Sequence, residues 1–258
     1  MQASTDGVLN TGRAFFALGL VAFGVLQFFH DDFVAGRAPA WPATLSGRLP
    51  WAWTTGVLFV VAGSCILANA RAARTAALLV GITIFGWAFL RHLPGLVSSP
   101  GGAALTAAGK ALALTGGALA VASSLSPRSG GSWRLLDPAG RFGLGVFMVL
   151  AGVQHFVYAS FVAGLVPVWI PGALVWTCLT GVALIAGGVG LFLRPTRRRA
   201  ALLSGLMILS WVVLLHLPRA WSAGPAESRN EWTALFEALA FAGTAFVLAG
   251  RERSDNDA

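Results

Sequence analysis

The sequence predicts an all-α membrane protein whose eight transmembrane helices form two parallel four-helix repeats, related by a pseudo-two-fold axis along the membrane normal. Composition supports the membrane assignment, because 56% of the 258 residues are hydrophobic and only 11% are charged. Soluble domains carry about a quarter charged residues. Apolar runs near the ~20 residues needed to cross a bilayer recur along the chain. The third observation is an internal duplication of the sequence.

Hydropathy and helix-breaking residues divide the chain into eight expected helices. They cover residues 13–30, 52–70, 74–93, 102–123, 141–158, 173–193, 199–217 and 232–250. The third and seventh helices are expected to end at a His-Leu-Pro sequence, because proline disfavours helical geometry in the residue before it. The predicted domains are a first repeat at 12–124, a cytoplasmic linker at 125–139, a second repeat at 140–250, and polar tails at 1–11 and 251–258.

The two halves of the chain are copies of one unit. Residues 12–36 align without gaps on residues 140–164, with ten of the 25 positions identical. Ordered landmarks continue the match: Trp51 with Trp176, Gly56 with Gly181, Trp87 with Trp211, and His92-Leu93-Pro94 with His216-Leu217-Pro218. The first apolar segment resembles a signal peptide. Its counterpart is internal, however, so the first segment is expected to remain as a transmembrane helix.

The arginines predict the orientation. An even number of helices per repeat brings both repeats into the membrane from the same side, with twelve arginines on the side of the termini and five on the other. Cytoplasmic loops carry the excess of Arg and Lys, so both termini are expected in the cytoplasm. The single lysine among eighteen basic residues, with the high Ala and Gly content, suggests a GC-rich bacterial genome. The expected location is therefore the bacterial cytoplasmic (inner) membrane.

The net charge of +8 does not indicate nucleic-acid binding, because the basic residues lie in short clusters between apolar runs. The sequence also holds no serine–histidine–acid set, no phosphate-binding glycine loop and no H-E-x-x-H zinc motif. Cys65 and Cys178 lie alone in separate apolar segments, which gives no support to a thiolate metal site. No catalytic residue and no metal site are predicted.

All four histidines are expected at the outer ends of odd-numbered helices. Gln and Trp side chains lie within a few residues of them, and together these types can hydrogen-bond a polar ligand at one membrane depth. The pattern predicts an outer-leaflet pocket lined by Gln154, His155, Trp211 and His216. Its counterpart in the first repeat would be lined by Gln27, His30, Trp87 and His92.

Each of these side chains also has a structural interpretation. His92 and His216 could bond the free carbonyls of a helix end, and the two roles weigh equally. Gln154 and His155 are more simply explained as bonding a neighbouring helix. Haem is disfavoured as a cofactor, because His30 and His155 differ by three residues in the alignment and a retained site should keep its ligand. A metal at Asp31-Asp32 is disfavoured, since the second repeat has Ala159 and Ser160 there.

The second repeat carries the pattern "GVQHF…FVAG.VP.W.P" at 152–171 and "HLPR" at 216–219. With the paired helices, these motifs resemble the DoxX-like membrane proteins, in which four-helix units occur as single copies. The chain looks like a tandem fusion of two such units. The resemblance implies an all-helical membrane protein and, as for some members, association with quinone-linked oxidation systems such as thiosulfate:quinone oxidoreductase.

The expected function is a membrane subunit or module of a quinone-linked redox system without stand-alone catalysis, whose pocket binds a quinone-like or lipid-like ligand. Quinone is the cofactor considered, and the expected partners are the lipid bilayer and redox proteins, the two repeats forming a pseudo-dimer within one chain. The alternative is a non-redox scaffold, or a carrier of lipids or small solutes along the axis between the repeats. The chain lacks the broken helix pairs typical of transporter sites, so the carrier ranks second.

Lys110 and Glu237 occupy the same position in the two repeats, and each is followed by Ala-Leu-Ala in the fourth helix of its repeat. An unpaired charge at the centre of a membrane helix disfavours insertion by about 2.5–3.5 kcal/mol. The opposite signs therefore predict that Lys110 bonds Glu237 where the two fourth helices meet. The alternative is that each side chain reaches the headgroups separately.

Overall fold

The computed structural model describes residues 2–34, 41–42, 44–98, 100–125 and 136–252, and every regular element within these ranges is helical. The first half contains α1 (Gln2–His30), α2 (Arg48–Leu67), α3 (Ala73–Trp87), the π-helical η2 (Ala88–His92), α4 (Leu93–Ser98) and α5 (Gly102–Ser124). The second half contains α6 (Leu136–Val157), α7 (Ala159–Ala163), α8 (Ala173–Gly190), α9 (Arg197–Trp211), the π-helical η4 (Val212–His216), α10 (Leu217–Ser222) and α11 (Pro225–Arg251).

Eight helices of the described part are long and apolar enough to cross a membrane. Two of them are composite, since Ala73–Ser98 joins α3, η2 and α4, and Arg197–Ser222 joins α9, η4 and α10. This number and this composition confirm the prediction of an all-helical chain with eight such segments. They indicate a multi-pass membrane protein.

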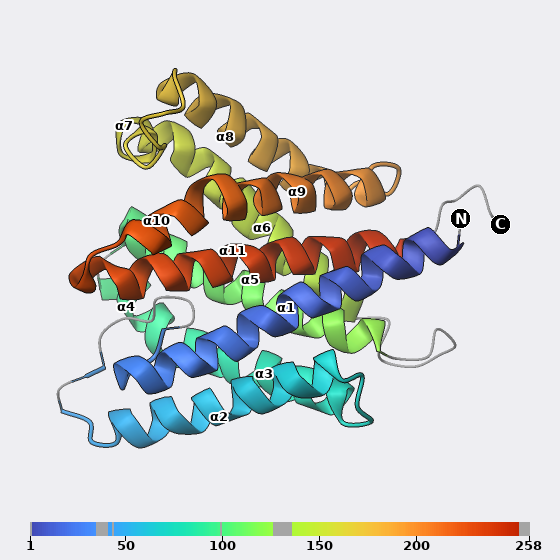
Figure 1. Ribbon diagram of the computed structural model, residues 1–258, viewed down its shortest axis with the longest axis vertical. Helices are drawn as coiled ribbons and strands as arrows, with labels where there is room; N and C mark the ends of the chain where they lie inside the picture. Colours follow the sequence, from blue (N-terminus) through green and yellow to red (C-terminus); the bar gives the residue numbers. More distant parts are fainter. Residues whose placement is uncertain (1, 35–40, 43, 99, 126–135, 253–258) are drawn as a thin grey trace.

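Four helices form the centre of the molecule, and a pair of helices flanks them on each side (Figure 1). The central four are α1, α5, α6 and α11, with α1 packed on α11 and α5 packed on α6. α2 and α3 cover one side, and α8 and α9 cover the other. α11 is buried almost without interruption from Thr233 to Gly250, which makes it the helix that joins the two sides.

Small residues allow the central helices to approach each other closely. A Cβ atom on Gly12 of α1 would lie 2.5 Å from the backbone nitrogen of Val247 in α11, and one on Gly243 would lie 2.5 Å from the backbone nitrogen of Phe16. Only glycine fits at both positions, because the clash is with backbone that cannot rotate away. Close backbone contact through small residues is the usual way that membrane helices associate.

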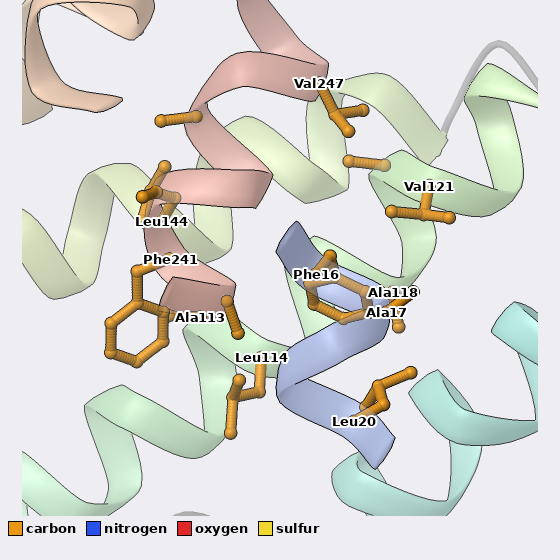
Figure 2. Close-up of a cluster of buried hydrophobic side chains, with 14 of the residues drawn as sticks. Phe16, Ala17, Leu20, Ala113, Leu114, Ala118, Val121, Leu144, Phe241 and Val247 are labelled. Carbon is orange, nitrogen blue, oxygen red and sulfur yellow. The ribbon is translucent and has the colours of Figure 1, made fainter. Parts of the chain in front are cut away.

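The core lies where these central helices meet (Figure 2). Phe16 and Leu20 of α1 and Leu114 of α5 are fully buried, beside Leu144 of α6 and Val247 of α11. Alanines such as Ala113 and Ala118 fill the remaining positions. The alternation of large apolar side chains with Ala and Gly lets the large ones interdigitate at the density of a protein interior.

The structure corrects the expected ends of the third and seventh helices. Neither stops before proline, since the helix continues to Ser98 in the first half and to Ser222 in the second. A π-helical segment precedes each proline, and the backbone N–H of Leu93 donates to the carbonyl of Ala88, five residues back. Proline has no N–H for the carbonyl four residues earlier, and its ring collides with that carbonyl. The wider π turn accommodates both effects, so the helix need not end.

Other boundaries also differ from those expected. α1 begins at Gln2 and α6 begins at Leu136, so most of the expected N-terminal tail and the end of the expected linker are helical. Arg251, expected in the C-terminal tail, ends α11. The rest of the linker, residues 126–135, and residues 253–258 of that tail lie outside the described residues.

Candidate functional site

All four histidines lie at one end of the bundle, called here the histidine end. His30 ends α1, His155 lies in the last turn of α6, and His92 and His216 end the two π-helical segments. α4, α7 and α10 lie at this end, while the start of α1 and the end of α11 lie at the other (Figure 1). Alternation of helix direction along the chain produces this gathering, as the sequence predicted.

A cavity of about 1060 Å³ opens in the second half, between α5, α6, α8, α9 and α11. Its volume is at the upper limit of ordinary small-molecule sites. The cavity wall is almost wholly apolar and includes Leu144, Phe147, Met148, Leu184 and Ile208. Six residues singled out in the sequence analysis also line it, namely Gln154, His155, Trp211, His216, Lys110 and Glu237. The structure therefore brings the predicted second-repeat residues to one cavity.

Gln154 is fixed by α5. The Thr106 hydroxyl donates to Gln154 Oε1 at 2.8 Å, and Gln154 Nε2 donates to the carbonyl oxygen of Gly102 at 3.0 Å. A glutamine side chain has two N–H groups, so one N–H remains beyond these two bonds. Gln154 thus makes the interhelical bonds that its structural interpretation required, while it still lines the cavity.

His155 is held in one orientation by its own helix. Nδ1 lies 2.7 Å from the carbonyl oxygen of Ala151. A carbonyl oxygen only accepts, so Nδ1 carries the proton in this contact. In the neutral imidazole the other ring nitrogen, Nε2, is then a hydrogen-bond acceptor. The cavity wall therefore presents an acceptor at this position.

Trp211 and His216 reach the cavity at the two ends of one helical segment. Trp211 is the last residue of α9 and His216 the last of η4. Five residues in an α-helix would turn the second side chain well away from the first, whereas a π-helical turn is wider. The π segment before Pro218 thus helps to place both side chains on the cavity wall.

The deep part of the cavity contains an ion pair. Lys110 Nζ donates to Glu237 Oε2, the ammonium lying on α5 and the carboxylate on α11. The Glu237 side chain is 1% exposed and that of Lys110 is 15% exposed, so the lysine covers the glutamate. Gly102, Thr106 and Lys110 lie on one face of α5, and Lys110 is ~12 Å from Gly102 along the helix axis. The pair therefore lies well below the histidine end.

The cavity reaches the surface between α8 and α9. These helices meet at the 191–196 turn, where a Cβ on Gly190 would lie 2.7 Å from that of Ala200, and they separate toward the histidine end (Figure 1). Exposed apolar side chains of α8 and of η4, which continues α9, line the opening, among them Trp176, Leu179 and Leu214. In a bilayer such a surface faces hydrocarbon, so the opening is lateral.

The segment after α6 forms the rim of the cavity at the histidine end. Phe161 and Trp169 line the cavity and are 71% and 62% exposed. Arg219 of α10 fixes this segment, because its Nη1 donates to the carbonyl oxygen of Leu165 at 3.2 Å. The same guanidinium donates from Nε and Nη2 to both oxygens of Glu231 in α11. This bidentate pair ties the rim to the central helices.

The corresponding place in the first half is filled. Gln27, Trp87 and His92 line a void of only about 30 Å³, the size of one water molecule. Gln27 and His92 are 1% and 5% exposed. His30 is not among the residues that line this void, which corrects its predicted place beside the other three. In place of the predicted first-repeat pocket there is thus only a small void.

Phe33 and Arg91 fill the space. The Arg91 guanidinium carbon lies 4.8 Å from the centre of the Phe33 ring, and that ring stacks on Trp41 at 5.7 Å. Phe33 is 7% exposed, whereas Phe161, ten-fold more exposed, remains outside. The position before His216 is occupied by Leu215, which cannot make the cation–π contacts that retain Phe33.

Asp31 and Asp32 are bound by neighbouring side chains. Asp32 pairs with Arg229 of α11 at 3.1 Å, and Asp31 Oδ1 accepts a hydrogen bond from Trp53 Nε1 at 3.1 Å. From the sequence, both residues were expected only as the solvated start of a loop. In the structure they also bind side chains of α2 and α11 at the histidine end. The described residues contain no group of three or more His, Cys, Asp or Glu side chains that could hold a metal ion.

Two residues that hold parts of the site in place were not identified from the sequence. Thr106 holds Gln154, and Arg219 holds the rim. The signal for Thr106 was its place one turn before Lys110 on the same helix face. The partner of Arg219, Glu231, is in another helix, and no local pattern indicates such a pair.

A family model described as "Domain of unknown function (DUF8561)" matches residues 144–249, from α6 to α11. The match thus includes most of the cavity wall, and its description assigns no activity. No curated protein and no solved structure matches the chain. The resemblance to DoxX-like proteins stays a prediction.

Proposed function

We propose that this protein is a membrane-embedded binding module for a lipid-soluble ligand with a compact polar head, of the quinone class, and that it serves a quinone-linked redox system. The observation that carries the proposal is the cavity of about 1060 Å³, whose wall is apolar except for a few polar groups. Such a site suits an apolar body with a small hydrogen-bonding end.

The polar groups lie at two depths. Gln154, His155 and His216 are near the histidine end, and Lys110 with Glu237 is deeper. Because Glu237 balances the charge of Lys110, this part of the wall has no net charge and favours a neutral head over an ionised one. A quinone head is neutral and accepts hydrogen bonds through its carbonyl oxygens, which supports the class proposed.

The ligand enters from the bilayer through the lateral opening between α8 and α9. Exposed apolar residues on α8 and on η4, such as Val182 and Val213, continue the hydrocarbon environment up to the opening. An apolar tail can therefore stay in the lipid while the head occupies the cavity. The arrangement favours binding from the membrane over binding from water.

The first half is a closed copy of the same unit, and the chain arose by duplication with a pseudo-two-fold axis along the membrane normal. Paired details support this. Gly47 and Gly172, each four residues before a landmark tryptophan, have φ values of 92° and 74°. Gly24 approaches Gly56, as Gly152 approaches Gly181. The two π-helical segments, Ala88–His92 and Val212–His216, end at the matching histidines.

The orientation proposed places the histidine end at the outer face of a bacterial inner membrane and both termini in the cytoplasm. The arginine count supports this, because the side of the termini holds twelve and the other side five. Carriage of a solute along the central axis is less favoured, since buried side chains such as Phe16, Leu114 and Val247 fill that region.

Tryptophan fluorescence tests the binding. Purified protein in detergent should show saturable quenching when decylbenzoquinone is added, because Trp169, Trp176 and Trp211 line the cavity. Trp211→Phe should remove much of the quenching. The matched variant Trp87→Phe changes the filled counterpart and should leave saturable quenching intact. Quenching that never saturates, or that is equally reduced in both variants, would contradict the proposal.

A further inference from the structure

The cavity wall offers a hydrogen-bond acceptor that has no donor among the described residues. Glu237 lines the cavity at 1% exposure and uses Oε2 for Lys110, while its Oε1 has no hydrogen-bond partner among the described residues. A buried acceptor without a donor is unfavourable by the full desolvation of that atom. This atom therefore favours a ligand that brings an O–H or N–H group.

Lys110 makes the requirement more specific. Its ammonium has three N–H groups, and the ion pair with Glu237 uses one of them. The pair thus presents a donor and an acceptor side by side. A hydroxyl group can accept from the ammonium and donate to the carboxylate at once. A carbonyl or ether oxygen can only accept, and it would leave Glu237 Oε1 unsatisfied.

His155 supplies a second, independent acceptor. Its Nδ1 proton is directed to Ala151, so the neutral ring offers Nε2 as an acceptor on the same cavity. This acceptor lies nearer the histidine end than the ion pair does. Two acceptors at different depths, on different helices, thus favour the same chemistry.

We infer that the cavity selects a ligand with a hydroxyl-bearing head, a hydroquinone or other phenol, over the corresponding quinone, with the Lys110–Glu237 pair as the selecting group. This inference rests on the proposed function and specifies the ligand of the same site. It concerns binding preference alone and requires no transfer of electrons.

Three ligands of matched shape test the inference: decylhydroquinone, decylbenzoquinone and decyl-1,4-dimethoxybenzene. Titrations of the full chain in detergent are made without oxygen, followed by tryptophan quenching or calorimetry. Decylhydroquinone should bind about tenfold tighter than either of the others, as expected for one satisfied buried acceptor. Equal binding of all three, or tighter binding of the quinone, would overturn the inference and leave the proposed function standing. Binding of none of them would overturn the proposed function itself.

Two variants locate the selecting group. In Glu237→Gln the side-chain amide can itself donate, so the preference for hydroquinone should fall toward unity. His155→Phe leaves the ion pair intact and should reduce the preference less. An unchanged preference in a folded Glu237→Gln protein, judged by its elution from size-exclusion chromatography, would overturn the assignment. If that variant does not fold, the ligand series on the unaltered chain still decides.

Discussion

Lys110 and Glu237 are the clearest case of sequence reasoning at the scale of single residues. Opposite charges at matching positions of two apolar helices predicted a pair, and the structure joins Lys110 Nζ to Glu237 Oε2. The physical reason is that burial of either charge alone is far less favourable than burial of both together. The pair consequently fixes how α5 and α11 meet.

Removal of one partner should destabilise the protein strongly. We expect Lys110→Met or Glu237→Gln to lower the free energy of unfolding by about 3–5 kcal/mol, because an uncompensated charge or an unpaired polar group remains buried. The double variant should recover most of that loss. Thermal unfolding in detergent, followed by circular dichroism, measures all three. Losses that simply add in the double variant would contradict a direct interaction.

A matched control is the pair of Arg48 and Asp32, which are 3.5 Å apart near the surface, with side chains 53% and 23% exposed. Arg48→Met should change stability by less than about 1 kcal/mol, as for other surface ion pairs. A loss there as large as that in Lys110→Met would indicate that removal of any charge from this protein is harmful, whatever its partner.

The candidate site was predictable only in part. Gln154, His155, Trp211 and His216 could be grouped from the sequence, because alternating helix direction places their segments at one end of the bundle. The bonds that fix them could not, since Thr106 is 48 positions from Gln154 and Leu165 is 54 from Arg219. Such contacts depend on the rotation of each helix about its axis. The predicted place of His30 differs from the observed one for the same reason. His30 ends α1 and does not line the void that Gln27 lines.

At the scale of helices, close glycine contacts determine the walls of the cavity. A Cβ atom on Gly152 of α6 would lie 2.7 Å from the carbonyl oxygen of Gly181 in α8 and 3.0 Å from the backbone nitrogen of Ile185. These neighbours are backbone atoms, so the two helices would have to move apart. α6 and α8 form adjoining walls of the cavity, and their separation sets its width.

Gly152→Ala should therefore destabilise the protein by about 1–3 kcal/mol, as for other overpacked contacts, and should weaken ligand binding. Gly86→Ala in α3 is the matched control, because no atom lies within 4 Å of its added Cβ. Alanine in an open helical position should be neutral or stabilising by about 0.5–1 kcal/mol. Melting temperatures of the two purified variants measure the difference. Equal stability of the two would mean that α6 and α8 do not approach as closely as described.

Hydropathy predicted which segments of the chain are helical, but it did not predict where each helix ends. The eight apolar segments were found because each is long and strongly apolar, but Pro94 and Pro218 did not stop their helices. A preceding π turn accommodates a proline, and the sequence before it carries no simple mark of that turn. Leu93 and Leu217 both continue a helix where single-sequence reasoning about proline predicts an end.

At the scale of the whole molecule, the two halves differ most at the histidine end. Phe33 is packed between Trp41 and Trp87 beneath Arg91, while Phe161 stays at the rim of an open cavity. The residue before the histidine differs with them, being Arg91 in the first half and Leu215 in the second.

The orientation in the membrane can be tested by labelling of cysteines in intact cells. Cys65 and Cys178 are both free, so the background is Cys65→Ala with Cys178→Ala. Single cysteines are then introduced at Ser46 and Ser222 near the histidine end and at Ala72 in the turn before α3, all of them exposed. A membrane-impermeant maleimide should modify the first two and leave the third unmodified until the cells are opened.

The physical reason is the distribution of arginine. Arg71 and Arg74 flank Ala72, Arg194 lies in the other turn on that side, and Arg197, Arg198 and Arg199 begin α9 directly after it. This side is therefore expected in the cytoplasm. Labelling after permeabilisation shows that the cysteine at Ala72 is reactive and serves as the control. The reversed pattern would place the histidine end in the cytoplasm. The proposed ligand would then enter between α8 and α9 from the inner leaflet, with the cavity itself unchanged.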